Sequence, residues 1–370
     1  MTNFFDKKLG FGFLRLPLTD SNDDTSVDIE ETKRMVDLFL SRGFTYFDTA
    51  YNYHGHQSEE FLREALTSRY PRSAYKLTTK LPCPAVKRGK TPEEIFNHQL
   101  QKCGVDYFDI YLLHGLDGED AVYAEEHGCF DFLKQVKADG RAKHIGFSFH
   151  DTADVLDGIL MLHPEMEVVQ IQLNYLDWDN EIIQSAACLE VCRKHQKPVI
   201  VMEPIKGGTL ANLPEKAADL LKGEKAAHAA LRFAASQEGV AAVLSGMSSL
   251  SQLEENTALF SPFTPLTQNE RAALGEIAKI IRETVSIPCT ACSYCTDDCP
   301  KQIPIPRYFA LYNERERDDW QANTEDRYAE LTKTFSKASE CISCRACEGR
   351  CPQKLPISEL MAKVSKVYDA

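Results

Sequence analysis

The chain lacks any long hydrophobic run, and no apolar stretch in its 370 residues approaches the twenty or so that a membrane span needs. No secretory leader is expected, because residues 1–6 do not form a charged segment followed by an apolar one. It also lacks an excess of positive charge. A net charge of -13 disfavours nucleic acid and anionic membrane surfaces as partners. These absences predict a soluble, cytoplasmic protein.

A dinucleotide-binding fingerprint of the Rossmann type is also missing. Residues 9–13 read Leu-Gly-Phe-Gly-Phe, which has only the opening of the G-x-G-x-x-G pattern. No flavin motif is visible in the chain. A doubly wound nucleotide-binding domain of that kind is therefore not expected.

Cysteine, by contrast, is abundant, with 13 residues. Residues 289–300 and 341–352 both read C-x-x-C-x-x-C-x-x-x-C-P. This is the bacterial iron–sulfur run, in which three close thiolates hold one cluster and the fourth cysteine ligates the other cluster. Two [4Fe-4S] clusters are predicted. The expected ligands are Cys289, Cys292, Cys295 and Cys351 for one, and Cys341, Cys344, Cys347 and Cys299 for the other.

Disulfides and zinc are the alternatives for these cysteines. A disulfide framework is typical of small secreted domains, and no secretory signal is expected here. Zinc sites built from four cysteines are common, but they usually pair two C-x-x-C elements. They have no use for a third cysteine at the same interval followed by Cys-Pro, twice. The doubled spacing therefore favours clusters.

Strand-like and helical patterns alternate over the first 260 residues. Apolar strand-like runs lie at residues 9–14, 44–48, 75–79, 108–113, 144–148, 168–173, 199–202 and 241–244. Amphipathic helical patterns follow them at residues 29–41, 59–68, 92–103, 130–138, 153–162, 181–194, 225–236 and 250–259. Eight such units predict an α/β fold, a closed (β/α)8 TIM barrel, with an open doubly wound sheet as the runner-up.

The pattern changes after Pro262. Residues 267–285 read as one further helix, and Pro288 opens the cysteine-rich tail. Residues 307–339, between the cysteine runs, are polar and helix-favouring, and too long for a simple loop. The predicted organisation is a barrel over residues 1–265, a connecting helix over 266–287, and a small, mainly helical ferredoxin-like domain over 288–370.

Ionisable residues gather at three consecutive strand ends of the predicted barrel, which is where barrel enzymes place their reacting groups. Asp48 ends the second strand, Tyr53 follows it, Lys80 ends the third and His114 ends the fourth. Singly, each has an ordinary explanation as a cap, a packed ring, a solvated amine or a structural histidine. Their joint placement predicts a catalytic tetrad.

These residues carry a resemblance to a known family. The sequence Phe-Asp-Thr-Ala-Tyr-Asn-Tyr at 47–53, Thr79-Lys80 and residues 109–114 resemble the Asp, Tyr, Lys, His tetrad of the aldo-keto reductases. Residues 57–60 resemble that family's Gly-x-Ser-Glu. With the tail included, the chain is similar to a subgroup with a C-terminal ferredoxin-type domain.

The resemblance implies an oxidoreductase that reduces a carbonyl or oxidises an alcohol. Tyr53 would be the general acid in reduction and the base in oxidation. Lys80 would supply a positive charge that makes a phenol a better proton donor, and Asp48 would hold Lys80. His114 would hydrogen-bond the substrate oxygen as negative charge develops.

The resemblance also implies a nicotinamide nucleotide, NAD(P)H. Ser148 and Gln170 would bind the carboxamide, the loop from Pro204 to Gly208 and the turn at Ser245 and Gly246 would meet phosphates, and Glu255 and Asn256 would meet adenine. Departures from the family pattern are Phe149, Met202 and Gln252, the last in place of the usual cation for the 2′-phosphate. Loss of that cation argues against a strong NADP preference.

Two functions stay open at this point. In the first, the tetrad acts on a small-molecule carbonyl or alcohol, while the clusters exchange single electrons with a redox partner protein. Hydride moves two electrons together and each cluster moves one, so the clusters could instead feed electrons to the substrate directly. In the second, the chain is an electron-transfer or redox-sensing protein with a vestigial tetrad.

Overall fold

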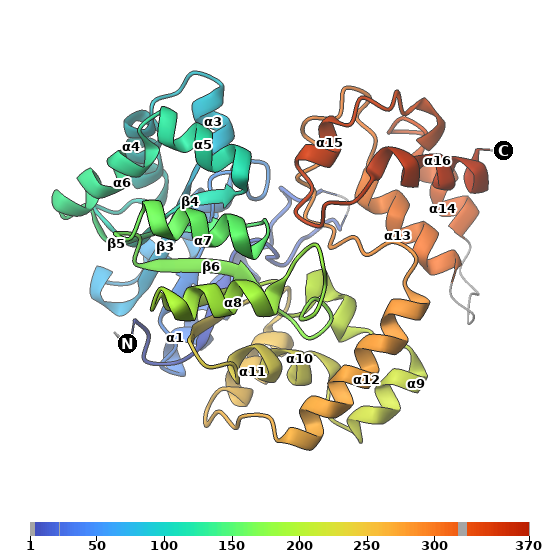
Figure 1. The fold of residues 1–370 in the computed structure, drawn as a ribbon, viewed down its shortest axis with the longest axis horizontal. Coiled ribbons are helices and arrows are strands. Elements are labelled where there is room, and N and C mark those ends of the chain that lie inside the picture. Colours follow the sequence, from blue (N-terminus) through green and yellow to red (C-terminus); the bar gives the residue numbers. More distant parts are fainter. Residues whose placement is uncertain (1–3, 22, 317–323, 370) are drawn as a thin grey trace. The chain divides into compact units, whose positions relative to one another are not determined.

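The computed structural model describes residues 4–21, 23–316 and 324–369 (Figure 1). Its sheet is a closed barrel of eight parallel strands in sequence order, because β1 pairs with β8 as well as with β2. The strands are β1 (Leu9–Gly12), β2 (Tyr46–Asp48), β3 (Lys76–Pro82), β4 (Phe108–Leu116), β5 (Ala142–Phe149), β6 (Val168–Gln172), β7 (Val199–Met202) and β8 (Val240–Gly246). The predicted barrel is confirmed, and the open sheet is excluded.

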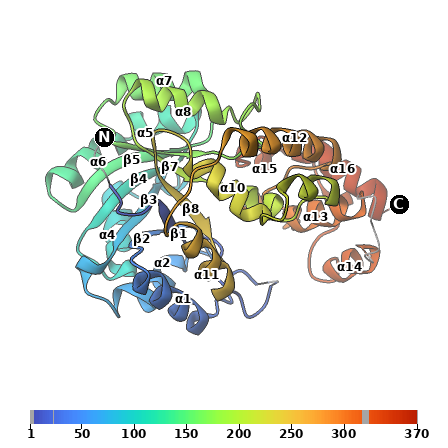
Figure 2. The ribbon, with the colours of Figure 1, turned by 90° about the horizontal axis from the view of Figure 1, so that it is seen from below.

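Helices surround the barrel strands (Figure 2). The outer helices are α1 (Ile29–Ser41), α2 (Ser58–Leu62), α4 (Pro92–Cys103), α6 (Cys129–Ala138), α7 (Ala153–Leu162), α8 (Ser185–Lys194), α10 (Ala226–Ala235) and α11 (Leu250–Leu259). Shorter helices α3 (Cys83–Lys87), α5 (Gly118–Glu126) and α9 (Glu215–Ala218) lie in the connections. The sequence analysis did not predict these three, because α3 and α9 are too short for a clear apolar stripe and α5 buries only Ala124.

Local chemistry explains several helix boundaries. Thr91 caps α4 through a capping box, in which its hydroxyl accepts from the Glu94 amide while the Glu94 carboxylate accepts from the Thr91 amide. The predicted helix over residues 181–194 begins only at Ser185. The Asn180 side chain accepts the amides of Ile182 and Ile183, and this turn competes with the helix.

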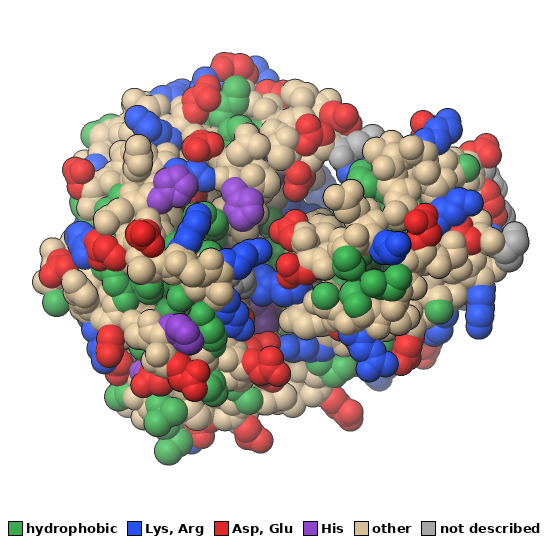
Figure 3. Space-filling model, turned by 90° about the horizontal axis from the view of Figure 1, so that it is seen from above, with side chains coloured by type: hydrophobic (Ala, Val, Ile, Leu, Met, Phe, Trp, Pro, Cys, Tyr) green, Lys and Arg blue, Asp and Glu red, His purple; other side chains and the backbone are tan. Residues whose placement is uncertain are grey.

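The barrel interior is apolar. One core cluster consists of Phe5, Tyr46, Ile110, Leu112, Val168, Ile200, Ala242 and Leu244. Strands β5 and β6 approach so closely that a Cβ on Gly146 would lie 1.9 Å from the Val168 carbonyl oxygen. The barrel surface visible in Figure 3 mixes acidic and basic side chains. On that face the negative net charge is therefore not gathered in one patch.

The tail is mainly helical. It contains α12 (Gln268–Thr284), α13 (Ile305–Arg315), α14 (Thr324–Leu331), α15 (Ala346–Gly349) and α16 (Ile357–Tyr368). Its core includes Tyr308, Phe309, Met361 and Val364, which are fully buried. The predicted helices between the cysteine runs are present as α13 and α14, and residues 317–323 lie outside the described residues. No helix of the described residues is long and apolar enough to cross a membrane.

The two cysteine runs repeat in backbone conformation as well as in spacing. Positive φ angles of 51° at Ala291 and 64° at Ser293 recur as 53° at Ser343 and 60° at Arg345. Gln302 at 53° is matched by Lys354 at 49°. Each run is followed by a helix, α13 or α16, that begins at the corresponding isoleucine. The tail is therefore an internal duplication in structure.

The chain divides into two compact units. One comprises residues 1–204 and 228–268, and the other comprises residues 205–227 and 269–370. The segment 205–227, which we call the β7 connection because it follows β7, therefore groups with the tail. It lies inside the sequence range predicted for the barrel.

Candidate active site and iron–sulfur segment

The predicted tetrad lies on the second, third and fourth strands of the barrel. Asp48 is the last residue of β2, and Tyr53 lies in the loop after it. Lys80 and His114 lie near the carboxyl ends of β3 and β4, each two residues before the strand ends. Strands β2, β3 and β4 are neighbours in the barrel, so the fold brings these residues to one end of it.

Lys80 and Asp48 form a buried ion pair. The Lys80 Nζ lies 2.6 Å from Asp48 Oδ1 and donates a second hydrogen bond of 2.8 Å to the Thr49 carbonyl oxygen. The side chains of Lys80 and Asp48 are 1% and 3% exposed. Burial lowers the pKa of the Lys80 ammonium, and the Asp48 carboxylate opposes that shift. Asp48 therefore helps to keep a positive charge in a dry site.

Tyr53 and His114 lie next to this pair. The Lys80 Nζ is 5.3 Å from the centroid of the Tyr53 ring. The rings of Tyr53 and His114 meet edge to face with centroids 6.0 Å apart. Each of these two residues keeps 8% of its surface exposed, whereas Lys80 and Asp48 are almost fully covered. The tyrosine and the histidine are therefore the more exposed members of the predicted tetrad.

A second buried network supports Lys80 from its backbone side. Gln99 Nε2 donates 3.0 Å to the Lys80 carbonyl oxygen and 2.7 Å to Glu59 Oε1, and Thr79 Oγ1 donates 2.7 Å to the same carboxylate oxygen. Tyr111 completes the network by donating to Gln99 Oε1 at 2.7 Å. Burial raises the pKa of Glu59, and the hydrogen bonds from Thr79 and Gln99 oppose that shift. The sequence indicated Glu59, because it belongs to the segment 57–60 that resembles Gly-x-Ser-Glu. No sequence pattern indicated Gln99.

The residues expected at the nicotinamide are paired across two strands. Ser148 on β5 lies opposite Gln170 on β6. Ser148 Oγ accepts the Gly115 amide at 2.7 Å, and both side chains are buried. Gln170 Oε1 is buried and has no hydrogen-bond partner within the part of the chain that the structure describes. A buried acceptor without a donor suits the amide group of a nicotinamide.

The residues expected at the phosphates and the adenine make mostly local contacts. Asn256 Nδ2 donates 3.2 Å to Ser245 Oγ, and Glu255 Oε2 lies 3.8 Å from His228 Nε2. Gln252 Oε1 accepts the Ser248 amide at 2.8 Å, so its amide caps a turn at the start of α11. A Cβ added at Gly246 would come within 3.0 Å of the Arg15 Cβ. The aliphatic part of the Arg15 side chain therefore lies beside the turn that is expected at the phosphates.

Pro204 and Gly208, the ends of the other expected phosphate loop, fall in different compact units. Gly208 has a φ of 101°, and Lys206 and Gly207 before it also have positive φ. Only glycine adopts such angles freely, so Lys206 is held in an unfavourable backbone conformation. No pattern in the sequence indicated that the residues from 205 onward group with the tail.

The cysteines of the tail fall into the two expected neighbourhoods. Burial raises the pKa of Cys295, and the nearby thiols of Cys292, Cys289, Cys351 and Cys347 add to that shift, so one thiol of the second neighbourhood also lies close to it. Burial likewise raises the pKa of Cys347 to about 11, with Cys341 and Cys299 among the further causes. The fourth cysteine of each run, Cys299 or Cys351, thus contributes to the raised pKa of a thiol in the other run.

A pocket that is open to solvent lies at the second neighbourhood. Its lining includes all four cysteines expected there, Cys299, Cys341, Cys344 and Cys347. Apolar side chains such as Ile303, Ile357 and Met361 complete the wall. Four thiols around one apolar pocket fit a cubane cluster, in which each thiolate binds a different iron.

Within residues 4–21, 23–316 and 324–369, no group of three or more His, Cys, Asp or Glu residues converges closely enough to hold a single metal ion. All of the cysteines are free of disulfides, and those outside the tail, Cys83, Cys103, Cys129, Cys188 and Cys192, are buried.

A closed (β/α)8 barrel with ionisable side chains at the carboxyl ends of adjacent strands has the architecture of a barrel enzyme. Residues 8–279 match the family model described as the aldo/keto reductase family, and residues 288–355 match the 4Fe-4S dicluster domain. The chain therefore belongs to the aldo/keto reductase family. It is an oxidoreductase that carries a 4Fe-4S dicluster domain.

Individual relatives are distant. The chain is 26% identical to the L-galactose dehydrogenase of Arabidopsis thaliana over 286 residues, 70% of this chain and 85% of that one. It is 28% identical to an aldo-keto reductase of Mycolicibacterium smegmatis over 210 residues, 54% of this chain and 70% of the relative.

Solved structures share the barrel fold. An aldo-keto reductase from Bacillus halodurans, in its holo form, matches with a TM-score of 0.57 and 23% identity, over 73% of this chain and 91% of that one. An aldo/keto reductase from Klebsiella pneumoniae, in complex with NADP and acetate, matches with a TM-score of 0.56 and 19% identity over the same shares.

Proposed function

We propose that this chain reduces a carbonyl compound, or oxidises the corresponding alcohol, with Tyr53 as general acid and base. The observation that carries the proposal is the buried Lys80–Asp48 pair beside the Tyr53 ring. An ammonium in a site of low dielectric favours the phenolate that remains after proton donation. Such a pair is costly to bury, so its presence is better explained by chemistry than by stability.

A bound nicotinamide would supply the hydride in this reaction. Ser148 and Gln170 would hold its amide, since Gln170 offers a buried acceptor. Tyr53 would donate its proton to the carbonyl oxygen as the carbonyl carbon gains the hydride, and would recover a proton from solvent afterwards. His114, edge-on to Tyr53, would donate a hydrogen bond to the same oxygen. Lys80 and Asp48 would stay in place throughout.

The identity of the nucleotide is part of the proposal. A Klebsiella pneumoniae relative in fold binds NADP. Here Gln252 is neutral and its amide is engaged by Ser248, so it cannot pair with a 2′-phosphate as a cation would. We therefore expect NADH to be used at least as well as NADPH. Glu255 and Asn256 would lie at the adenine end.

We also propose that the dicluster domain passes single electrons to or from a redox partner protein. One cluster would be held by the first three cysteines of the first run with Cys351, and the other by those of the second run with Cys299. The thiol neighbourhoods around Cys295 and Cys347 support this crossed assignment. We keep residues 1–265, 266–287 and 288–370 as proposed barrel, connecting helix and dicluster domain.

The test of the catalytic proposal compares Tyr53→Phe with Tyr51→Phe in anaerobically purified holoprotein. Tyr51 lies in the same loop and donates no proton in the proposed reaction, so it is the matched control. Turnover of a panel of aldehydes and ketones with NADH or NADPH should fall roughly 10²- to 10⁴-fold in the first variant. Turnover in the second should stay near that of the wild type. Near-normal activity of Tyr53→Phe would refute the assignment.

The same preparation tests the coupling to the clusters. Addition of NADH or NADPH without substrate should bleach the cluster absorbance if the nucleotide reduces the clusters. Carbonyl turnover without bleaching would leave the clusters outside the nucleotide reaction. Absence of both, in protein that holds its clusters, would support an electron-transfer protein with a vestigial tetrad.

A further inference from the structure

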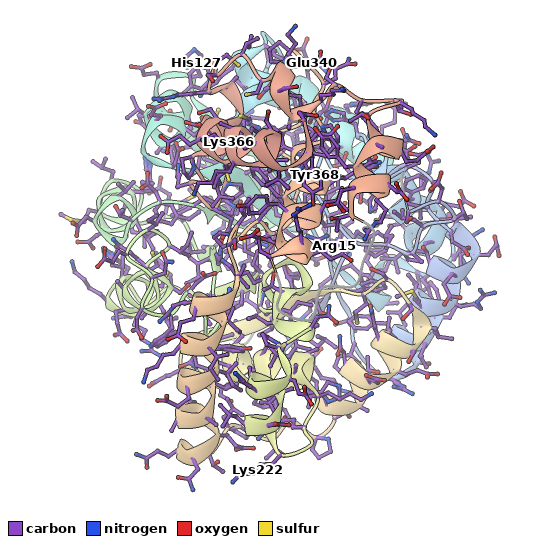
Figure 4. The ribbon with its side chains drawn as sticks, turned by 90° about the vertical axis from the view of Figure 1, so that its right-hand side faces the viewer. Arg15, His127, Lys222, Glu340, Lys366 and Tyr368 are labelled. Carbon is purple, nitrogen blue, oxygen red and sulfur yellow. The ribbon has the colours of Figure 1, made fainter. Side chains whose placement is uncertain are left out.

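Glu59 is the only buried glutamate among the residues that the structure describes, and its side chain is 0% exposed. Other carboxylates, such as that of Glu340, lie at the surface, where water solvates them (Figure 4). A carboxylate without water is costly to the folded protein unless hydrogen bonds and a cation compensate for the loss. The proposed reaction assigns no part to Glu59, so its burial needs an explanation.

The partners of Glu59 come from the strand and the helix that follow it in the barrel. Its Oε1 accepts a hydrogen bond of 2.7 Å from Thr79 Oγ1 on β3 and another of 2.7 Å from Gln99 Nε2 on α4. Its Oε2 lies 3.8 Å from the Nζ of Lys102, whose side chain is only 7% exposed. Two donors and a nearby cation favour the ionised form of this side chain.

The Gln99 amide links this carboxylate to the backbone of Lys80. Its Nε2 lies 2.7 Å from Glu59 Oε1 and 3.0 Å from the Lys80 carbonyl oxygen, and its Oε1 accepts the Tyr111 hydroxyl at 2.7 Å. A carboxylate and a carbonyl oxygen can only accept. The reverse orientation of the amide would place its oxygen against both of them, so these partners determine which way Gln99 points.

Asp48 and Glu59 act on Lys80 from different sides of β3. Asp48 pairs with the ammonium directly at 2.6 Å. Successive side chains of a strand point to opposite faces, so Thr79 points away from the side that carries the Lys80 side chain. Glu59 holds Thr79 directly and holds the Lys80 carbonyl oxygen through Gln99. With these groups held, the strand has little freedom to turn the Lys80 side chain away from Asp48.

We propose that Glu59 is a positioning residue for carbonyl reduction, which acts through Gln99 and Thr79 to fix β3 at Lys80 so that the ammonium faces Asp48. The negative charge of Glu59 also favours the Lys80 ammonium, in the same direction as that of Asp48. This inference deepens the proposed function and rests on it. Glu59 is fully covered, so it touches neither the substrate nor the reacting atoms.

The groups around both charges decide how a change at Glu59 would be seen. Lys80 faces Asp48 on β2, Tyr53 in the loop after β2, and Glu59 on α2. Glu59 faces Glu60, Lys80, Lys102, Cys103 and Tyr111. Burial raises the pKa of Cys103 and of Tyr111, and the Glu59 carboxylate adds to both shifts, so both stay neutral near neutral pH. Loss of the Glu59 charge should therefore let Lys80 lose its proton at a lower pH.

The experiment is the pH dependence of carbonyl turnover in the holoprotein with Glu59→Gln. The new amide keeps the size of the side chain, and its oxygen can still accept from Thr79 and Gln99, so the substitution removes mainly the charge. We expect kcat at neutral pH to fall about tenfold, KM to change less than about threefold, and the alkaline limb of the kcat profile to move roughly one pH unit lower. A merely structural residue would lower the unfolding temperature and leave that limb in place.

Glu60→Gln is the matched control. Glu60 is the next residue and also lies 4.0 Å from the Lys102 Nζ, but its side chain is 58% exposed. Its substitution should leave kcat and the pH profile unchanged, because water screens its charge.

Thr79→Val and Thr79→Ser keep the proposal testable if Glu59→Gln does not fold. Thr79→Val keeps the shape of the side chain but removes its hydrogen bond to Glu59, so kcat should fall several-fold with little change in KM. Thr79→Ser keeps the hydroxyl and should retain nearly the activity of the wild type.

Three results would overturn the proposal. They are an unchanged kcat profile in Glu59→Gln, an equal shift in Glu60→Gln, and an equal loss of kcat in Thr79→Ser and Thr79→Val. Near-normal turnover in Tyr53→Phe would instead refute the proposed function. A normal profile in Glu59→Gln, together with loss of turnover in Tyr53→Phe, would refute the positioning role alone.

Discussion

At the residue scale, the predicted active site depends on a buried ion pair, Lys80 and Asp48. Lys80 is 1% exposed and donates hydrogen bonds to Asp48 and the Thr49 carbonyl oxygen, and the Asp48 carboxylate opposes the lowering of the Lys80 pKa by burial. Breaking a buried pair by removal of one partner typically costs about 3–5 kcal/mol, because the other charge is left uncompensated. The tetrad is therefore sensitive to substitutions that leave its shape almost unchanged.

Asp48→Asn should change the pH dependence of carbonyl reduction as well as its rate. Burial lowers the pKa of Lys80 and the Asp48 carboxylate raises it, so loss of that carboxylate lowers the Lys80 pKa further. The ammonium is then lost at a lower pH, and the alkaline limb of the kcat profile should move to lower pH. A profile that keeps its shape and falls only in height would contradict this role for Asp48.

Gln170→Met should weaken nucleotide binding with little loss of stability. Its Oε1 has no partner among the described residues, so the folded protein loses no hydrogen bond from that atom. Loss of one hydrogen bond to a ligand costs about 0.5–1.5 kcal/mol, or up to roughly a tenfold rise in Kd. Titration calorimetry and thermal unfolding would measure the two effects separately.

Gln172→Met provides the contrast on the same strand. Gln172 Nε2 donates 2.7 Å to the buried Asp177 carboxylate, so its removal should lower the unfolding temperature more than Gln170→Met does. If Gln170→Met is the more destabilising of the two, Gln170 is a structural residue and its expected nucleotide role is wrong.

At the element scale, the duplicated cysteine runs hold one another. Asp298 and Arg350, each directly before the fourth cysteine of its run, form an ion pair of 3.3 Å. The ion pair therefore joins the two runs directly before Cys299 and Cys351. In the tail, whose described residues contain no β-strand, this ion pair joins the two runs that are proposed to supply four thiols to each cluster.

Replacement of a fourth cysteine should damage the cluster of the opposite run. In Cys299→Ala we expect loss of the cluster held by Cys341, Cys344 and Cys347, because Cys299 lines their pocket. Iron content and paramagnetic resonance of the reduced protein would identify which cluster is lost. Cys129→Ala, which removes a buried thiol of the barrel, should retain both clusters. Loss confined to the first run would contradict the crossed assignment.

At the scale of the whole molecule, the two compact units do not follow the order of the sequence. Residues 205–227 interrupt the barrel sequence but pack with residues 269–370. The phosphate loop predicted from Pro204 to Gly208 is therefore cut by the unit boundary. The tail is more than an appendage, since part of the barrel sequence depends on it for its packing.

Removal of residues 285–370 should expose the β7 connection. Lys206 would lose Gln353, and Gly207 would lose its contact with Thr290. Limited trypsin digestion should then cut faster at Lys206, which is buried in the intact chain. Lys222, already exposed, should be cut at a similar rate in both proteins. Equal protection of Lys206 in the truncated chain would show that the tail does not hold this connection.

Much of this organisation could be read from the sequence. Alternating strand and helix periods predict the barrel because parallel strands need helical crossovers. The cysteine spacing predicts the clusters because thiolates must converge at short intervals. Placement of Asp48, Lys80 and His114 near consecutive strand ends follows from the register of those strands. These patterns are local, or repeat at a fixed interval, so they can be recognised in the sequence without knowledge of the fold.

Only the tertiary structure decided the remaining contacts, because they join residues far apart in sequence through chemistry without a local pattern. Gln99 supports Lys80 from a helix that looks like any amphipathic helix, and Lys206 meets Gln353 across 147 positions. The sequence by itself determined which side chains could do the chemistry. The fold decided which of them are buried and what they face, because desolvation and contact are properties of packing and not of order along the chain.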